Sequence, residues 1–375
     1  ASKDHLWLET LGLQSIERVE PARLLGHYWI VAVTGLAVVD EGAWILDRYR
    51  RPVHSLACHM LEFGHSREPA AVRVVEAEDG ERVMVIAEDP TFGMPTLMPY
   101  FGWSIVHICA GDVATLGVAP QYMTICLLLP PGTSPETLEG LWKQIDEECE
   151  KLGISIIGGH TGIYPGISYP LNGGCTVIGF GTKDQLTPAS NARPGDRLIM
   201  TKGLAIEAAG ILAHQAEVEL KRALGDETVE RAKSRLWDMT VVKDALVAAP
   251  YAHAMHDATE GGFLNAVYEV AEASGIGVKV YEDRVILTDE VKAVCDYFAI
   301  DPLISISEGT LVIAAAEAEA PKVIEELKKN GIDAAVVGEF TERERTFVRK
   351  GGKEEALVPV KVDPFWEAYF RSLQP

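Results

Sequence analysis

The chain has 375 residues, which is too long for one ordinary core of about 100–200 residues and about right for two domains. Its formal net charge of −21 argues against nucleic acid or an anionic membrane surface as a partner. The six cysteines lie far apart without a CxxC pair, as is typical of buried thiols in a reducing compartment. The most apolar early stretch, 28–39, is too short to cross a bilayer and no signal peptide is visible, so we expect a cytoplasmic protein.

The first half of the chain contains a hairpin and a strongly capped helix. Residues 1–63 form an N-terminal extension to which the sequence assigns no role. From residue 70, apolar and polar residues alternate around Asp79-Gly80, which predicts a β-hairpin whose second strand ends near Glu88 and Asp89. Ser134 as N-cap and Pro135 after it predict a helix over 134–152. A short buried strand at 154–157 is then expected to lead into a glycine-rich loop at 158–162.

The second half alternates strands and helices, which favours an α/β fold. A turn at Pro194-Gly195 marks the domain boundary, between about 183 and 194, so we expect domains at 64–188 and 189–375. Beyond it we expect a strand at 197–201, a helix from 204, a long helix over 227–248, a loop at 256–262, an amphipathic helix to 274 and a helix over 321–331.

Four segments, in this order, resemble the aminoimidazole-ribonucleotide-synthetase (PurM)-like superfamily, which also holds the HypE proteins and selenophosphate synthetases: AEDPTFG (87–93), AGDVATLGVAP (110–120), IIGGHTG (156–162) and MHDATEGG (255–262). Two further stretches support them, PGDRLIMTKGLAIEAAGILA and SISEGTLVIAA. The resemblance implies a two-domain PurM-like fold of the α/β (α+β) class. In that fold the N-terminal, ATP-binding domain forms a β-barrel with a second copy, and the C-terminal domain is an α/β sandwich. It therefore also implies a homodimer.

The resemblance also assigns roles to individual residues. It implies that ATP lies between the domains with Mg²⁺ held by Asp89, Asp112 and Asp257. It places the nucleotide against two glycine-rich segments, through Gly158, Gly159, Thr161, Thr259, Gly261 and Gly262. His160 and Asp112 are the expected catalytic residues. Carboxylates suit this role because Mg²⁺ prefers hard oxygen ligands and usually bridges one or two of them to phosphate oxygens. Gly261 and Gly262 would lie in the first turn of a helix, where free N–H groups receive anions.

Each of these residues has a plainer alternative. Asp112 could cap a helix that begins at Val113, Asp89 could terminate a strand, and Asp257 could be an ordinary residue near an N-cap. The GGHTG segment could be a simple turn, with His160 bonded to its backbone. One further group looks metal-binding but lacks the paired spacing of a structural zinc site: His54, Cys58, His59 and His65. Cys58 is better explained as an inert buried thiol than as a nucleophile.

The chain departs from its relatives at three places. Glu68-Pro69 stands where they carry an acidic pair, and Gly111 stands where an asparagine precedes the aspartate. The sequence ends RSLQP, without the terminal cysteine that receives a carbamoyl group in HypE proteins, and its last cysteine is Cys295.

These features predict an ATP- and Mg²⁺-dependent enzyme that phosphorylates a small molecule or an amide or carbonyl oxygen of an unknown acceptor. The alternatives are a small-molecule kinase of the thiamine-monophosphate-kinase type and a non-catalytic nucleotide-binding or assembly dimer.

Overall fold

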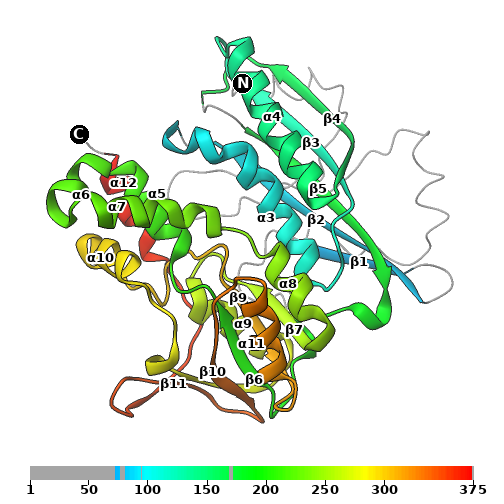
Figure 1. The fold of residues 1–375 in the computed structure, drawn as a ribbon, viewed down its shortest axis with the longest axis vertical. Coiled ribbons are helices and arrows are strands. Elements are labelled where there is room, and N and C mark those ends of the chain that lie inside the picture. The colour runs from blue at the N-terminus through cyan, green and yellow to red at the C-terminus, as the bar shows by residue number, and fades with distance from the viewer. Residues whose placement is uncertain (1–71, 77–80, 94, 169–171, 374–375) are drawn as a thin grey trace, which may run out of the picture. The chain divides into compact units, whose positions relative to one another are not determined.

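The computed structural model describes residues 72–76, 81–93, 95–168 and 172–373. The N-terminal extension, the histidine and cysteine group at 54–65, Glu68-Pro69 and the Asp79-Gly80 turn lie outside these ranges. Within them, none of the helices combines the length and the apolar character that crossing a bilayer requires. The described residues contain two β-sheets with helices packed on them, which confirms the mixed α/β architecture (Figure 1).

In the described part of the chain, the N-terminal sheet has five strands. Their order across the sheet is β1 (Val72–Glu76), β2 (Arg82–Phe92), β5 (Asn172–Thr182), β3 (Tyr122–Leu129) and β4 (Ser155–Ile163), and only β3 and β4 are parallel. The predicted hairpin is confirmed, since β1 and β2 pair antiparallel with Val72 opposite Ala87. However, β2 keeps its pairing with β5 as far as Phe92. Asp89 therefore lies inside a strand, and the expectation that the strand ends there is wrong.

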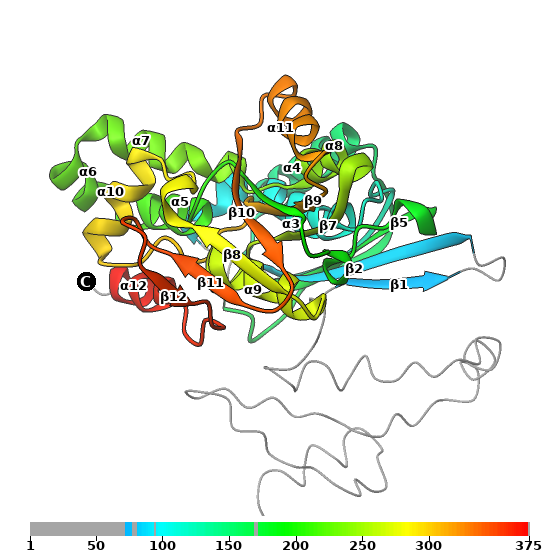
Figure 2. The ribbon, with the colours of Figure 1, turned by 90° about the horizontal axis from the view of Figure 1, so that it is seen from below.

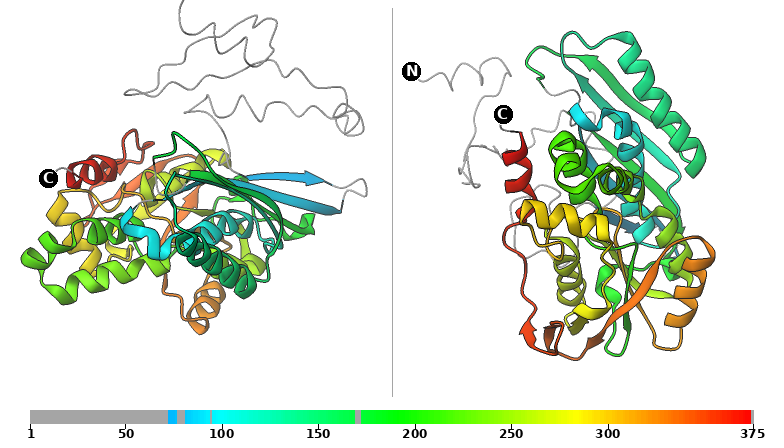
Figure 3. Two further views of the ribbon diagram at one scale, coloured as in Figure 1. Left: turned by 90° about the horizontal axis from the view of Figure 1, so that it is seen from above. Right: turned by 60° about the vertical axis from the view of Figure 1, so that its left-hand side comes forward.

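One face of this sheet packs on two helices, α3 (Phe101–Thr115) and α4 (Pro135–Leu152), as Figure 3 shows. Along β3, Ile125 and Leu127 are buried on this inner face, and Cys126 between them is less buried, on the opposite, outer face. The helix predicted over 134–152 is confirmed. Its first turn is capped by the Ser134 hydroxyl, which accepts a hydrogen bond from the N–H of Thr137, and Gly153 ends it in a left-handed conformation.

The C-terminal sheet has seven strands among the residues that the structure describes. Their order is β12 (Glu354–Ala356), β11 (Arg345–Val348), β8 (Gly277–Tyr281), β10 (Ala334–Thr341), β6 (Arg197–Thr201), β9 (Leu311–Ala315) and β7 (Ala252–Asp257). Helix α9 (Gly262–Ala273) covers one face, and α8 (Val242–Ala248) and α11 (Ala320–Lys329) cover the other (Figure 2). Both faces are therefore buried: Leu198 and Met200 of β6 pack with α9, whereas Ile199 between them packs with α8 and α11. This explains why the central strands β6 and β9 carry continuous apolar runs, Leu198–Met200 and Leu311–Ala315.

Five more helices pack mainly on one another beside this sheet: α5 (Ile206–Gln215), α6 (Glu217–Leu224), α7 (Asp226–Ser234), α10 (Asp289–Phe298) and α12 (Pro364–Ser372). Short 3-10 turns complete the described structure: η2 (Pro95–Tyr100), η3 (Lys183–Gln185), η4 (Ala189–Asn191), η5 (Arg235–Asp238), η6 (Ala249–Tyr251) and η7 (Glu282–Arg284).

The single helix expected over 227–248 is wrong, because α7 and α8 are separate helices joined by η5. Leu236 in η5 is buried against Gly210 of α5, where a side chain on the glycine would leave no room for it. This tertiary contact determines where the chain turns.

A buried histidine ties α3 to the loop before α8 and predicts a pH-dependent stability. His107 Nδ1 lies 2.8 Å from Thr240 Oγ1, and His107 Nε2 lies 3.2 Å from Glu148 Oε2. Burial lowers the pKa of His107, against the opposing effect of Glu148. Below pH about 6.5 the unfolded chain therefore binds a proton that the folded chain does not, so the free energy of unfolding should fall.

Between pH 7 and 5.5 we expect the free energy of unfolding to fall by up to about 1 kcal/mol more in the wild type than in His107→Gln. Urea unfolding followed by circular dichroism measures this difference, and equal pH dependences would contradict it. The nearby charges of Glu148, Lys151 and Lys202 are the same in both proteins.

Candidate functional site

Three neighbouring strands of the C-terminal sheet bring polar residues to one edge. β6 and β7 end at the edge where the antiparallel strand β9 begins, and Asp257 pairs with Leu311 there. The N–H of Ala258 donates to Thr310 O at 2.9 Å, and the N–H of Leu311 donates to Thr201 Oγ1 at 3.1 Å. Lys202 follows Thr201, Asp257 precedes Ala258, and Glu308 lies two residues before Thr310. These two hydrogen bonds therefore bring all three residues to the same edge.

Asp89 and Asp112 approach the same edge from the N-terminal domain. Asp89 lies on the inner face of its sheet, opposite the buried Cys175. Its carboxyl group lies close to that of Asp112, and its Oδ2 atom is buried without a hydrogen-bond partner among the described residues. Asp112 lies in the last turn of α3, which begins at Phe101, so the interpretation that it caps a helix starting at Val113 is wrong. Burial raises the pKa of Asp112 well above its usual range, and the negative charges of Asp257 and Asp89 raise it further. The structure therefore brings the three predicted aspartates into one electrostatic cluster.

Glu308 and Glu207 belong to this cluster and were not singled out from the sequence. Glu308 is 3% exposed, and its backbone N–H donates to Glu207 Oε2 at 3.0 Å. Its Oε1 atom is buried and makes no hydrogen bond to any described residue. Burial raises the pKa of Glu308 well above its usual range, helped by the charges of Asp257 and Glu207. Burial likewise raises the pKa of Glu207 to about 8.

A buried lysine lies beside these carboxylates, but a separate aspartate compensates its charge. Lys202 Nζ lies 2.6 Å from Asp244 Oδ2, which also accepts a hydrogen bond from Thr201 Oγ1 at 3.0 Å. Lys202 also donates to the carbonyl oxygen of Thr240. Burial raises the pKa of Asp244, although the charge of Lys202 opposes the shift. The rest of the cluster therefore keeps an excess of acidic groups.

The ring of His256 contacts the carboxylates of both Asp257 and Glu269. Its Nδ1 atom lies 3.3 Å from Asp257 Oδ1, and its Nε2 atom lies 2.9 Å from Glu269 Oε2. Burial disfavours the charged imidazolium, but the hydrogen bonds to Asp257 and Glu269 outweigh this and raise the pKa of His256 to about 10. A charged His256 fixes the orientation of the Asp257 carboxylate.

The donor set of the cluster suits a hard divalent cation. Carboxylate oxygens are the ligands that Mg²⁺ prefers, and the buried, unbonded Glu308 Oε1 is an acceptor in need of a partner. In the part of the chain that the structure describes, however, no three His, Cys, Asp or Glu side chains already surround a point closely enough to hold an ion. Binding an ion would therefore require these side chains to adjust.

The ATEGG segment has a structure different from the one expected. α9 begins at Gly262, and Gly261 precedes it in a left-handed conformation. The N–H of Gly261 donates to Asp363 Oδ2 at 2.8 Å, and the N–H of Gly262 donates to Thr259 O at 3.0 Å. Both N–H groups that the sequence suggested as free anion donors thus have acceptors within the protein. Gly262 is needed for packing, because a Cβ there would lie 2.5 Å from Ser305 O.

The GGHTG segment is a strand, so the loop expected at 158–162 is wrong. Gly158, Gly159 and Thr161 lie in β4, which pairs parallel with β3. A Cβ on Gly159, which has φ +152°, would lie 2.1 Å from the carbonyl oxygen of Ile125. Close approach of the two strands therefore accounts for this glycine without a phosphate.

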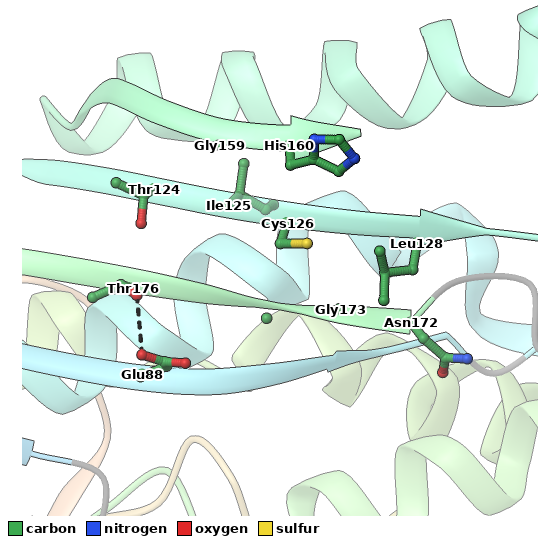
Figure 4. A pocket seen from close by; sticks show the side chains of 11 residues that line it. Glu88, Thr124, Ile125, Cys126, Leu128, Gly159, His160, Asn172, Gly173 and Thr176 are labelled. Atoms are coloured by element: carbon green, nitrogen blue, oxygen red, sulfur yellow. Dashed lines mark hydrogen bonds between the residues drawn. The ribbon is translucent and has the colours of Figure 1, made fainter. Parts of the chain in front are cut away.

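His160 faces away from the aspartates. It pairs with Cys126, whose side chain is on the outer face, whereas Asp89 is on the inner face with Cys175. His160 Nε2 lies 2.6 Å from the hydroxyl oxygen of Tyr164. With its neighbours it lines a cavity of about 610 Å³ on the outer face (Figure 4), whose polar side chains are Glu88, Thr124, Cys126, His160, Asn172 and Thr176. The described chain thus separates His160 from Asp112, the other predicted catalytic residue.

The residues that the sequence did not single out lie in segments that it had marked only as supporting the resemblance. Lys202 and Glu207 come from TKGLAIE, and Glu308 comes from SISEG. No short-range signal identifies them as site residues, because strand order alone brings 202, 257 and 308 together.

Comparison with known proteins places both halves of the chain in one family. The family models described as AIR synthase related protein, N-terminal domain, and AIR synthase related protein, C-terminal domain, match residues 67–180 and 193–351. The chain is 27% identical over 271 residues to the carbamoyl dehydratase HypE of Rhodobacter capsulatus, covering 70% of this chain and 76% of that protein.

Two solved structures show the same fold. A crystal structure of HypE from Escherichia coli, described as a hydrogenase maturation protein, matches with a TM-score of 0.64 and 26% identity over 75% of this chain and 87% of that one. A structure of hydrogenase maturation protein HypE in complex with ATP matches with a TM-score of 0.62 and 19% identity over 88% of this chain and 98% of that one.

Proposed function

Because the chain belongs to the AIR synthase-related family, we propose that it is an ATP-dependent enzyme whose nucleotide phosphates lie at the acidic cluster. The observation that carries the proposal is the convergence of Asp89, Asp112 and Asp257 from the two domains. The relative of similar fold that binds ATP supports the choice of nucleotide.

The cluster residues would hold Mg²⁺, with Glu308 as a further ligand. The ion would neutralise the negative charge of the phosphates. Catalysis of phosphoryl transfer consists mostly of such charge stabilisation together with positioning of the reactants. The chain itself fixes the carboxylates: His256 orients Asp257, α3 holds Asp112 in its last turn, and the buried edge of the sheet excludes water. The acceptor would be an amide or carbonyl oxygen or a small molecule.

We further propose that the enzyme is a homodimer formed through the outer face of the N-terminal sheet. That face carries exposed apolar side chains, among them Ile157 and Phe180, each more than half exposed. A second copy would cover them and would enclose the cavity beside His160. Analytical ultracentrifugation at micromolar protein concentration measures the mass of the particle in solution. A mass equal to that of one chain would contradict the proposed dimer.

Isothermal titration with ATP, with and without Mg²⁺, tests the proposed nucleotide site, with ADP and phosphate release followed in the same samples. We expect binding that depends on Mg²⁺ and slow hydrolysis in the absence of an acceptor. Absence of binding at millimolar ATP would contradict the proposal.

Two observations favour the non-catalytic alternative. The N–H groups of Gly261 and Gly262 already have protein acceptors, and the carboxylates do not surround a common point. A non-catalytic nucleotide-binding or assembly dimer would bind Mg·ATP but would release no ADP with any acceptor tested. The titration measures binding and the release assay measures turnover, so together they distinguish this alternative from the enzyme.

A further inference from the structure

A carboxylate near the C-terminus reaches back to the proposed site. Asp363 is 8% exposed and lies just before α12, which packs on α5 (Figure 1). It lies beyond residues 193–351, the part of the C-terminal half that the family model matches. Asp363 therefore lies outside every sequence segment from which site residues were predicted.

Asp363 connects two loops that are distant in sequence. Its Oδ2 atom accepts a hydrogen bond from the N–H of Gly261 at 2.8 Å, and the N–H of Ile306 lies beside the same carboxylate. Gly261 lies in the loop between Asp257 and α9, and Ile306 lies two residues before Glu308. One carboxylate thus binds the loop that follows Asp257 and lies beside the loop that carries Glu308.

The surrounding contacts strengthen this connection. The N–H of Val360 donates to Asn265 Oδ1 at 3.1 Å, and Asn265 Nδ2 donates to the carbonyl oxygen of Glu260 at 3.3 Å. The two loops also touch each other, since the position of a Cβ on Gly262 is only 2.5 Å from Ser305 O. The segment before α12 is therefore hydrogen-bonded to the loop that follows Asp257, and that loop packs directly on the loop that carries Glu308.

We infer that Asp363 is a positioning residue, which clamps the loop 258–262 to the loop 304–308 and so sets the distance between Asp257 and Glu308. This inference rests on the proposed function for its effect on nucleotide binding, but the clamp itself does not depend on it. Asp363 also caps α12, because its Oδ1 atom accepts from the N–H of Phe365 at 2.9 Å.

Asp363→Ser separates the clamp from the cap. Serine is a good N-cap and can still accept from Phe365, but its shorter side chain cannot reach Gly261 and Ile306. Hydrogen exchange of the full chain should therefore become faster in 258–262 and 304–308 and stay unchanged in α12. The Kd of Mg·ATP should rise about tenfold, a change of about 1.4 kcal/mol.

Ser134→Ala is the matched control, because it removes the N-cap of α4, a helix of the N-terminal domain. It should leave exchange in both loops and the Kd unchanged. Unchanged loop exchange in Asp363→Ser would overturn the clamp. If the wild type does not bind Mg·ATP, the proposed function fails, and faster loop exchange in Asp363→Ser still supports the clamp.

Discussion

Asp257→Asn is expected to weaken Mg²⁺-dependent ATP binding by about 100-fold and to reduce any turnover at least as much. Changes to residues that merely orient metal ligands already cost about 10- to 100-fold, and Asp257 is placed as a ligand itself. The substitution keeps the size of the side chain, and the amide oxygen can still accept a hydrogen bond from His256 Nδ1. The loss should therefore come from the missing charge. Titration with ATP in the presence and absence of Mg²⁺ measures it.

Glu269→Gln is the matched control for this prediction. Glu269 contacts the opposite nitrogen of the same histidine, but its side chain is 48% exposed and lies outside the cluster. If Glu269→Gln weakens binding as much as Asp257→Asn, the effect passes through the orientation of His256 and the ligand role of Asp257 is wrong. Asp112→Asn should match Asp257→Asn, because both carboxylates are assigned to the same ion.

Asp244→Ala is expected to lower the free energy of unfolding by about 3–5 kcal/mol, which is the usual cost of removing one partner of a buried ion pair. The side chains of Lys202 and Asp244 are 11% and 4% exposed, so the lysine would keep a buried charge without its counterion. Thr201 would also lose the acceptor of its hydroxyl hydrogen bond. Urea unfolding followed by circular dichroism gives the change.

An exposed ion pair provides the comparison. Lys279 Nζ and Glu354 Oε1 are also 2.6 Å apart, but their side chains are 31% and 56% exposed. Glu354→Ala should cost less than about 1 kcal/mol, because solvent screens such pairs. Similar costs for the two substitutions would show that burial of the Lys202–Asp244 pair does not control its contribution.

Local sequence signals were reliable where one segment's own chemistry decides its structure. Ser134, Pro135 and Gly153 define α4 because capping depends on neighbouring backbone groups. The helix predicted over 321–331 is present as α11, and β1 and β2 form the expected hairpin. In each case the residues that specify the element lie within it or next to it.

The same signals failed where contact with a neighbouring strand or helix determines the structure of a segment. GGHTG looked like a loop because of its glycines, but pairing with β3 requires glycine at 159. The apolar and polar pattern over 227–248 suited one helix, but packing of Leu236 on Gly210 divides it. Asp112 looked like a cap because α3 is buried on nearly all sides, so its mostly apolar start gives no amphipathic signal.

The sequence by itself determined the family resemblance, the α/β class and the three aspartates that meet, since these depend on residue types in a fixed order along the chain. Only the tertiary structure decided that Glu308, Glu207 and Lys202 join them, and that His160 lies on the other face of its sheet. The physical reason is that a site between two sheets is set by strand order and by the alternation of side chains along each strand. A shift of one residue in pairing reverses every side chain of a strand, and nothing within a single segment specifies its partner.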